Sequence, residues 1–210
     1  MPDTHLFYIH DPMCSWCYAF RSNLTALHKH LPSSIHIDYL LGGLAPDTTQ
    51  PMSIELQKTI QQTWLQIENT LPSVQFNYDF WKLNTPFRST YPACRAILAA
   101  KKQGSNFEIK MLNAIQKAYY QQAKNPSLQT TLQECATKIG LDPVNFIEDL
   151  TSTKIEDELQ GEIKLTRNMG VSSYPSLCLL HNEQQFLITV DYLNYQAMIN
   201  EVNNILSSPS

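Results

Sequence analysis

The stretch that decides the fold is Leu6–Cys17, LFYIHDPMCSWC. An apolar run is followed by two cysteines separated by two residues, and the positions after Cys17 have helical spacing. Two cysteines that open a helix can form and break a disulfide within one turn. The unpaired N–H groups and the dipole of the helix N-terminus favour the thiolate of the first cysteine. The motif therefore predicts a thiol–disulfide active site at a strand-to-helix junction.

The segments around this motif predict a β-α-β unit. His5–His10 is rich in β-forming residues, and the helix that follows ends before Pro32. Residues 35–41 then alternate between apolar and polar side chains, and Gly42-Gly43 marks the exit of a second strand.

The middle of the chain predicts helices almost throughout. Apolar residues recur at helical spacing from residue 53 to about residue 150, except over residues 72–86, where no element is indicated. Helix boundaries are indicated by Ser53, Pro92, Gly104, Thr131 with Glu134 as a capping box, Gly140 and Asp142-Pro143.

The last sixty residues return to a mixed pattern. Thr153 with Glu156 predicts a capped helix that Gly170 closes. Two strands, 176–181 and 185–190, follow around a tight turn at Asn182-Glu183, and then come a helix over 192–206 and a frayed tail over 207–210.

The predicted order is β-α-β, then helices, then α-β-β-α. This is the order of a thioredoxin fold, an α/β class, split by an inserted all-helical domain. We assign residues 1–48 to the N-terminal part of the thioredoxin fold, 49–150 to the helical insertion and 151–210 to the C-terminal part.

Composition and charge limit the classes of partner that the protein can bind and the cell compartment in which we expect it. The 210 residues are 43% hydrophobic and 16% charged, which is typical of a globular protein. A net charge of −4 without a basic stripe argues against nucleic acid, and no apolar run approaches the ~18 residues of a membrane span. The first residues lack the basic and apolar regions of a secretory signal, so we expect a cytoplasmic protein. In that reducing compartment a C-x-x-C pair indicates redox chemistry or metal binding.

Two segments carry a resemblance to a known family: residues 10–20, HDPMCSWCYAF, and residues 170–176, GVSSYPS. With the element order, they make the chain similar to the DsbA-like thioredoxin-fold oxidoreductases, and particularly to their signal-less FrnE-like branch. The resemblance implies that Cys14 is the exposed nucleophile and that Cys17 resolves the mixed disulfide. It also implies a cis peptide bond before Pro175, beside the disulfide, with the backbone of Tyr174 presented to a bound peptide.

The chain departs from its relatives near the cysteines. Ser15 and Trp16 stand where the strongly oxidising relative has Pro-His. Because Trp16 adds no positive charge that would stabilise a thiolate, we predict weaker oxidising power than in that relative. Related proteins often hold a buried acid six residues before the first cysteine, and this chain has Tyr8 there.

Most of the other residues near the motif have two interpretations. We expect Trp16 to be exposed and to contact substrate, or else to pack against the helical domain. His10 tunes Cys14 or relays a proton, or it is a solvated strand end. Asp11 with Pro12 is most simply a turn former. Cys94 is a core residue by default, or a third thiol that approaches Cys14.

The remaining cysteines and the metal hypothesis are simpler. Cys135 and Cys178 are predicted to be core residues. Half of a zinc site is the alternative for C-x-x-C, but the chain has no second C-x-x-C or H-x-H group to complete four ligands, so no metal or other cofactor is expected.

The sequence thus predicts an oxidoreductase acting on protein or peptide thiols and disulfides, with glutathione as a candidate redox partner. Two alternatives remain: a glutathione-dependent transferase or isomerase of the kappa-like sister group, and a redox-gated peptide-binding protein.

Overall fold

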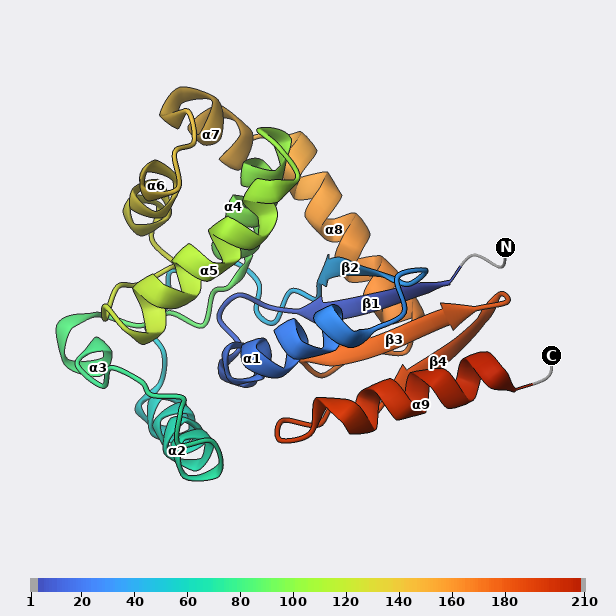
Figure 1. Cartoon of the computed structure of the whole chain (residues 1–210). Coiled ribbons are helices and arrows are strands. Elements are labelled where there is room, and N and C mark those ends of the chain that lie inside the picture. Colours follow the sequence, from blue (N-terminus) through green and yellow to red (C-terminus); the bar gives the residue numbers. More distant parts are fainter. Residues whose placement is uncertain (1–3, 209–210) are drawn as a thin grey trace.

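The computed structural model describes residues 4–208 and follows the predicted element order (Figure 1). Its elements are β1 (His5–His10), α1 (Ser15–His30), β2 (His36–Leu41), α2 (Ile54–Thr70), α3 (Phe80–Leu83), α4 (Tyr91–Lys102), α5 (Asn106–Tyr120), α6 (Gln129–Lys138), α7 (Pro143–Leu150), α8 (Thr153–Asn168), β3 (Ser176–His181), β4 (Gln184–Ile188) and α9 (Tyr195–Ser207).

The strands form one sheet in the order β2-β1-β3-β4. β1 runs parallel to β2 and antiparallel to β3, and β4 returns antiparallel to β3. Asn182 and Glu183 form the β3–β4 turn with φ values of 50° and 62°, the left-handed conformations that a two-residue hairpin turn requires. This sheet, with its helical insertion, is the predicted thioredoxin fold.

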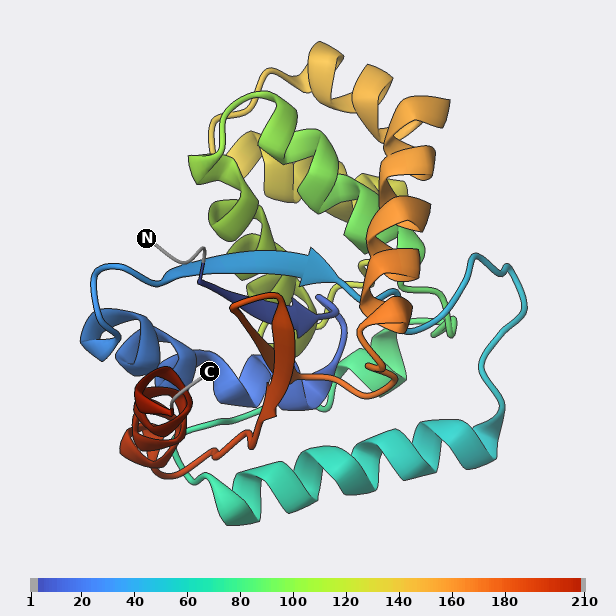
Figure 2. The same cartoon turned by 90° about the vertical axis from the view of Figure 1, so that its right-hand side faces the viewer.

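Alternation along β1 sends its side chains to two faces of the sheet. Leu6 and Tyr8 are buried in a cluster shared with α1 and α9, which lie side by side on one face of the sheet (Figures 1 and 2). Ile9 faces the other way and packs with Cys178 and Val171. The end of β1 is therefore buried from both sides, and the turn into α1 starts inside the protein.

The helical residues build a larger apolar cluster around Trp64, with α4 buried along most of its length. Figure 2 shows α2 running along an edge of the molecule, away from the group of α4–α7. α8 contributes Ile155, Leu159 and Ile163 to this cluster and also contacts β2. Because α8 contacts both the helical cluster and the sheet, the domain boundary that we placed at residue 151 stays a prediction.

Most element bounds agree with the sequence analysis, and several helix starts correct it. α8 is capped by Ser152, whose side chain accepts from the N–H of Ile155, so the Thr153 capping box was wrong by one residue. The Thr131 capping box was wrong as well, because α6 begins at Gln129 and Leu128 stands at its cap position without a side-chain hydrogen bond. The last helix begins at Tyr195 and not at residue 192.

Three smaller points complete the comparison. Residues 72–86, which indicated no element, contain the four-residue helix α3. β4 ends at Ile188 rather than at residue 190. The predicted frayed tail lies partly outside the described residues. No helix between residues 4 and 208 is long and apolar enough to cross a membrane.

Glu162 links α8 to the sheet next to the active-site end of β2. Its carboxylate accepts from the backbone N–H of Leu41 at 2.7 Å, and burial raises its pKa to about 7. A carboxyl that binds its proton more tightly in the folded state stabilises that state below its ordinary pKa, and this contribution is lost as the pH rises through about 7. We therefore expect wild-type stability to fall between pH 5 and pH 8 by as much as about 3 kcal/mol from this group.

Glu162→Gln should remove that part of the pH dependence, because glutamine keeps an acceptor for Leu41 and does not titrate. The measurement is thermal unfolding at pH 5 and pH 8. Asp157→Asn, which replaces an exposed carboxylate on the same helix, is the matched control and should keep the wild-type slope. Equal slopes in wild type and Glu162→Gln would contradict the assignment.

Candidate functional site

Cys14 and Cys17 lie at the start of α1, as the sequence predicts. Cys14 is the N-cap of the helix, and its Sγ accepts the backbone N–H of Cys17 at 3.4 Å. Both cysteines are free thiols. Cys14 is 8% exposed and Cys17 only 1%, so Cys14 is the more accessible thiol but less exposed than the resemblance implies. Burial, followed by the neighbouring Cys14 sulfur, raises the pKa of Cys17 well above its ordinary value.

Asp11 is the main site residue that sequence reasoning misjudged. It is fully buried rather than a surface turn former. Its carboxylate accepts from the N–H of Met13 at 2.8 Å, the N–H of Leu44 at 2.8 Å and the hydroxyl of Thr90 at 2.6 Å. Its backbone carbonyl accepts from Cys14 at 3.1 Å. Burial is the largest influence and raises the pKa of Asp11, while these hydrogen bonds oppose the shift.

Asp11 thereby joins three segments that are far apart in the sequence: the turn before Cys14, the segment after β2, and the start of α4. Relatives often hold a buried acid six residues before the first cysteine, and this chain places one three residues before it. The only sequence signal was its position between a buried strand and the cysteine motif.

Tyr174 and Pro175 face the cysteines from the other side. The peptide bond between them is cis, as the resemblance implies. The thiol of Cys14 donates to the carbonyl oxygen of Tyr174 at 3.4 Å. The Tyr174 hydroxyl donates to the carbonyl of Gly42 at 2.6 Å, so the loop that holds this carbonyl is anchored to the end of β2.

Gly42 is required for this anchor, and Gly42→Ala should slow disulfide exchange about tenfold and destabilise the protein by about 2 kcal/mol. A Cβ on Gly42 would lie 2.0 Å from a Tyr174 ring carbon, so the ring and its carbonyl must move. Unfolding and an exchange assay on one preparation measure both effects.

Gly161→Ala is the matched control, because nothing lies within 4 Å of a Cβ there and alanine favours the helix interior. Removing the ring in the double variant Gly42→Ala, Tyr174→Ala should recover much of the lost stability. A single variant with wild-type stability and rate would show that Tyr174 is not held in this way.

Ser15 and Trp16, between the cysteines, contact different parts of the fold. The Ser15 hydroxyl accepts the indole N–H of Trp64 at 2.8 Å, which fixes α2 to the motif. Trp16 is half-buried and not exposed: it packs against the helical cluster, as its alternative interpretation held, and its ring lies 4.8 Å from that of Tyr192.

A cavity of about 250 Å³ opens beside the motif, and Cys14 is one of its lining residues. Met13 and Trp16 next to the motif also line this cavity, and α2 contributes Leu56 and Ile60. The predicted contact of Trp16 with substrate remains a prediction.

His10 and Tyr8 are buried side by side on β1, and Tyr8 interacts with both cysteines. His10 is 1% exposed, so the prediction of a solvated strand end was wrong. Its ring stacks on that of Tyr8 at 5.0 Å, and burial lowers its pKa to about 3. Burial, and then the neighbouring thiols of Cys17 and Cys14, raise the pKa of Tyr8 well above its ordinary value. Both rings are therefore neutral at pH 7.

The other cysteines are buried in the core. Cys135 and Cys178 are 2% and 0% exposed, as predicted. Cys94 is fully buried, and its Sγ lies 3.6 Å from the carboxylate of Asp11. Burial, followed by the Asp11 charge, raises the pKa of Cys94 well above its ordinary value, which favours the protonated thiol. Among residues 4–208, no three His, Cys, Asp or Glu side chains are placed to share a metal ion.

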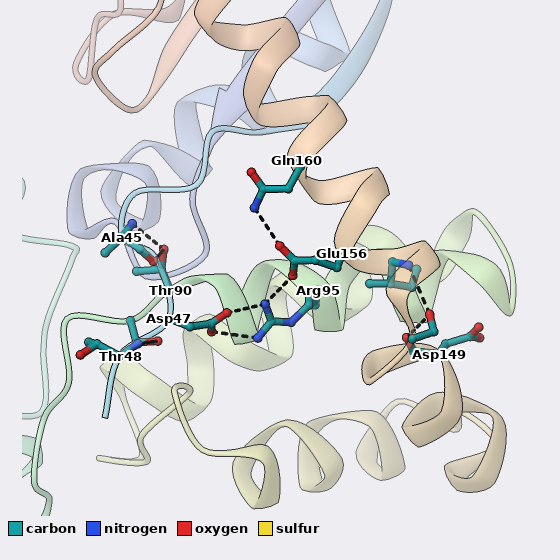
Figure 3. A network of polar contacts seen from close by, with 11 residues as sticks. Ala45, Asp47, Thr48, Thr90, Arg95, Asp149, Glu156 and Gln160 are labelled. Atoms are coloured by element: carbon teal, nitrogen blue, oxygen red, sulfur yellow. Dashed lines mark hydrogen bonds and ion pairs between the residues drawn. The ribbon is translucent and has the colours of Figure 1, made fainter. Parts of the chain in front are cut away.

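A polar network joins the segment between β2 and α2 to α4 and α8 (Figure 3). The N–H of Ala45 donates to the hydroxyl of Thr90 at 3.1 Å. Arg95 on α4 makes two hydrogen bonds to Asp47, at 2.7 and 2.8 Å, and a third to Glu156 on α8 at 2.7 Å. These bonds hold the segment that includes Leu44 against α4 and α8.

Comparison with known proteins gives a family model and distant relatives. A family model described as Thioredoxin matches residues 7–201. The curated relatives include the ClpXP adapter protein SpxH of Halalkalibacterium halodurans, 24% identical over 176 residues, or 82% of this chain and 57% of that protein. The Bacillus subtilis protein of the same name is 24% identical over 83% of this chain and 58% of its own length. This chain thus spans less than two thirds of these relatives.

Solved structures agree over nearly the whole chain. A candidate protein disulfide isomerase from Nitrosomonas europaea superposes with a TM-score of 0.84 at 22% identity, covering 97% of this chain and 98% of that one. The cytosolic disulfide reductase DsbM of Pseudomonas aeruginosa gives 0.74 at 22% identity, covering 96% and 98%, and has also been solved with GSH. At these identities the matches show the fold.

Proposed function

The chain belongs to the thioredoxin family, and from this we propose that it is a thiol–disulfide oxidoreductase in which Cys14 attacks and Cys17 resolves. One observation carries the proposal: Cys14 Sγ lies at the N-terminus of α1, within hydrogen-bond distance of the N–H of Cys17 and of the Tyr174 carbonyl beside cis-Pro175. The N–H group of Cys17 holds the Cys14 sulfur at the first turn of the helix, and the carbonyl offers a backbone partner to a bound chain.

The reaction follows from the positions of the two sulfurs. The Cys14 thiolate attacks one sulfur of a substrate disulfide, a new S–S bond forms, and the other substrate sulfur leaves as a thiolate. Cys17 then loses its proton to the departing thiolate and attacks the Cys14 sulfur, which releases the second substrate thiol. The substrate disulfide gains two electrons and becomes two thiols. The enzyme loses the same two electrons and is left with a Cys14–Cys17 disulfide.

Re-reduction needs an external thiol, and we assign this role to glutathione. Two glutathione molecules reduce the Cys14–Cys17 disulfide and leave as oxidised glutathione. Such a cycle requires a reducing compartment, and the structural relative DsbM is described as cytosolic and as a disulfide reductase. We therefore propose work in the cytoplasm on protein or peptide disulfides.

The experiment is the reduction of 2-hydroxyethyl disulfide by glutathione, followed as NADPH consumption through added glutathione reductase. Wild-type protein should accelerate the reaction in proportion to its concentration. No acceleration over the uncatalysed rate, with a correctly folded protein, would refute the proposal.

A second candidate function comes from the curated relatives, which are named adapter proteins. The cavity beside Cys14 would then hold a partner peptide without turnover, and the cysteine pair would control its access. Peptide binding that changes with the redox state of the pair, in the absence of catalysed exchange, would favour this function over the first.

A further inference from the structure

Arg88 is the charged side chain that lines the cavity beside Cys14. The rest of the lining is apolar or uncharged, and no acidic side chain contributes to it. A cation and the reactive sulfur therefore share one enclosure of about 250 Å³. An electrostatic interaction is stronger in such a partly enclosed site than at an open surface.

Arg88 makes no hydrogen bond, ion pair or ring contact within residues 4–208, and its charge acts only on the hydroxyl of Tyr119, which also lines the cavity. Arg95 is bonded to Asp47 and Glu156, and Arg21 lies over the ring of Tyr18 at 5.4 Å. Arg167 is an interaction partner of Tyr174. The donors of the Arg88 guanidinium are therefore available to a ligand.

The backbone that carries Arg88 is held on both sides. Phe87 forms an isolated β-bridge with Pro51, and the N–H of Met52 donates to the carbonyl of Pro86 at 2.8 Å. The next residues, Ser89 and Thr90, are each 2% exposed. A cation on such a fixed segment is preorganised for recognition, because little backbone freedom is lost when a ligand binds.

We propose that Arg88 is a specificity-determining residue, and that the cavity selects thiols and disulfides with a carboxylate close to the reacting sulfur. This inference rests on the proposed function and names its substrate class. A carboxylate matches a guanidinium in charge and in fork geometry. A preference for anionic disulfides would have to come from this local cation, because the protein's net charge of −4 by itself disfavours anionic substrates.

Three small disulfides of similar length test the proposal by charge alone: anionic 3,3′-dithiodipropionate, neutral 2-hydroxyethyl disulfide and cationic cystamine. The quantity is kcat/KM for each, divided by the rate constant of the same disulfide with free glutathione. Wild type should favour the anionic over the neutral compound by about tenfold, the size of a charge-assisted hydrogen bond.

Arg88→Gln should bring the anionic-to-neutral ratio close to one, and Arg88→Lys should keep part of the preference. Arg21→Gln removes an arginine one turn beyond Cys17 and is the matched control, expected to keep the wild-type ratio. An anionic-to-neutral ratio that is near one in wild type, or that survives Arg88→Gln, overturns the proposal. Failure to turn over any of the three disulfides refutes the proposed function itself.

Two further substrates distinguish the sources of the carboxylate. Oxidised glutathione carries a free carboxylate one residue after its cysteine. A terminally blocked peptide disulfide with glutamate next to cysteine carries its carboxylate on a side chain. The one whose rate falls more in Arg88→Gln identifies the natural source, and a loss with neither contradicts recognition of a carboxylate.

Discussion

Replacing Cys14 with serine is expected to abolish thiol–disulfide exchange, with a loss of at least about 1,000-fold in rate. The hydroxyl remains protonated at neutral pH and forms no stable bond to a substrate sulfur, so the first step cannot occur. Serine fits the space and can still accept the N–H of Cys17, so the fold should persist. The measurement is glutathione-dependent reduction of 2-hydroxyethyl disulfide by both proteins at equal concentration.

Cys17→Ser separates the two roles. Attack by Cys14 still occurs, but in the absence of glutathione nothing resolves its product, so a mixed disulfide with the substrate should accumulate and be detected by mass spectrometry under non-reducing conditions. Cys135→Ala, which removes a buried helical cysteine, is the control and should retain wild-type turnover. Turnover by Cys14→Ser above about a tenth of wild type would contradict the assigned roles.

Replacing Asp11 with alanine should cost about 3 kcal/mol of stability and slow exchange strongly. The change leaves the buried N–H groups of Met13 and Leu44 without their acceptor and frees Thr90 from the turn before Cys14. Urea unfolding measures the first effect, and the exchange assay measures the second. Asp47→Ala, which removes a half-exposed ion pair with Arg95, is the control and should cost less than about 1 kcal/mol.

Asp11→Asn removes the charge but keeps the size. Asparagine has one acceptor oxygen, so one of the two N–H groups loses its partner, and a smaller loss is expected. The pKa of Asp11 is raised in the folded protein, so protonation of this carboxyl stabilises the wild-type fold at low pH. This stabilisation is lost as the pH rises through the raised pKa. The stability difference between wild type and Asp11→Asn should therefore shrink with rising pH. An Asp11→Ala variant as stable as wild type would rule out this role of Asp11.

Local sequence predicts the parts of this protein whose causes are local. The strand β1, the start of α1 at the cysteines and the turn at Asn182-Glu183 all follow from residues that are close in sequence. Where two neighbouring residues have the same propensity, the bounds shift, as when Ser152 rather than Thr153 caps α8. The cis bond before Pro175 was reached through the family resemblance and not from the residues alone.

The rest of the site depends on contacts between distant segments. Asp-Pro is an ordinary turn sequence, and only Leu44 and Thr90, brought to Asp11 by the fold, make it a buried junction. Trp16 was expected at the surface because the local sequence does not show its contact with Tyr192. That residue lies 176 residues further along the chain and is brought to Trp16 by the fold. The sequence left His10 open between a tuning residue and a solvated strand end for the same reason, since the burial of the end of β1 is set by elements outside the strand.

The most direct measurement of the central claim is the reduction potential of the Cys14–Cys17 pair, by equilibration with glutathione buffers and quantification of free thiols. We expect a reversible two-electron couple that is lost in Cys14→Ser, with a potential more reducing than the ~−120 mV of the strong oxidant DsbA. A potential as oxidising as that would contradict the effect assigned to Trp16. The absence of any reversible couple would contradict the thiol–disulfide site itself.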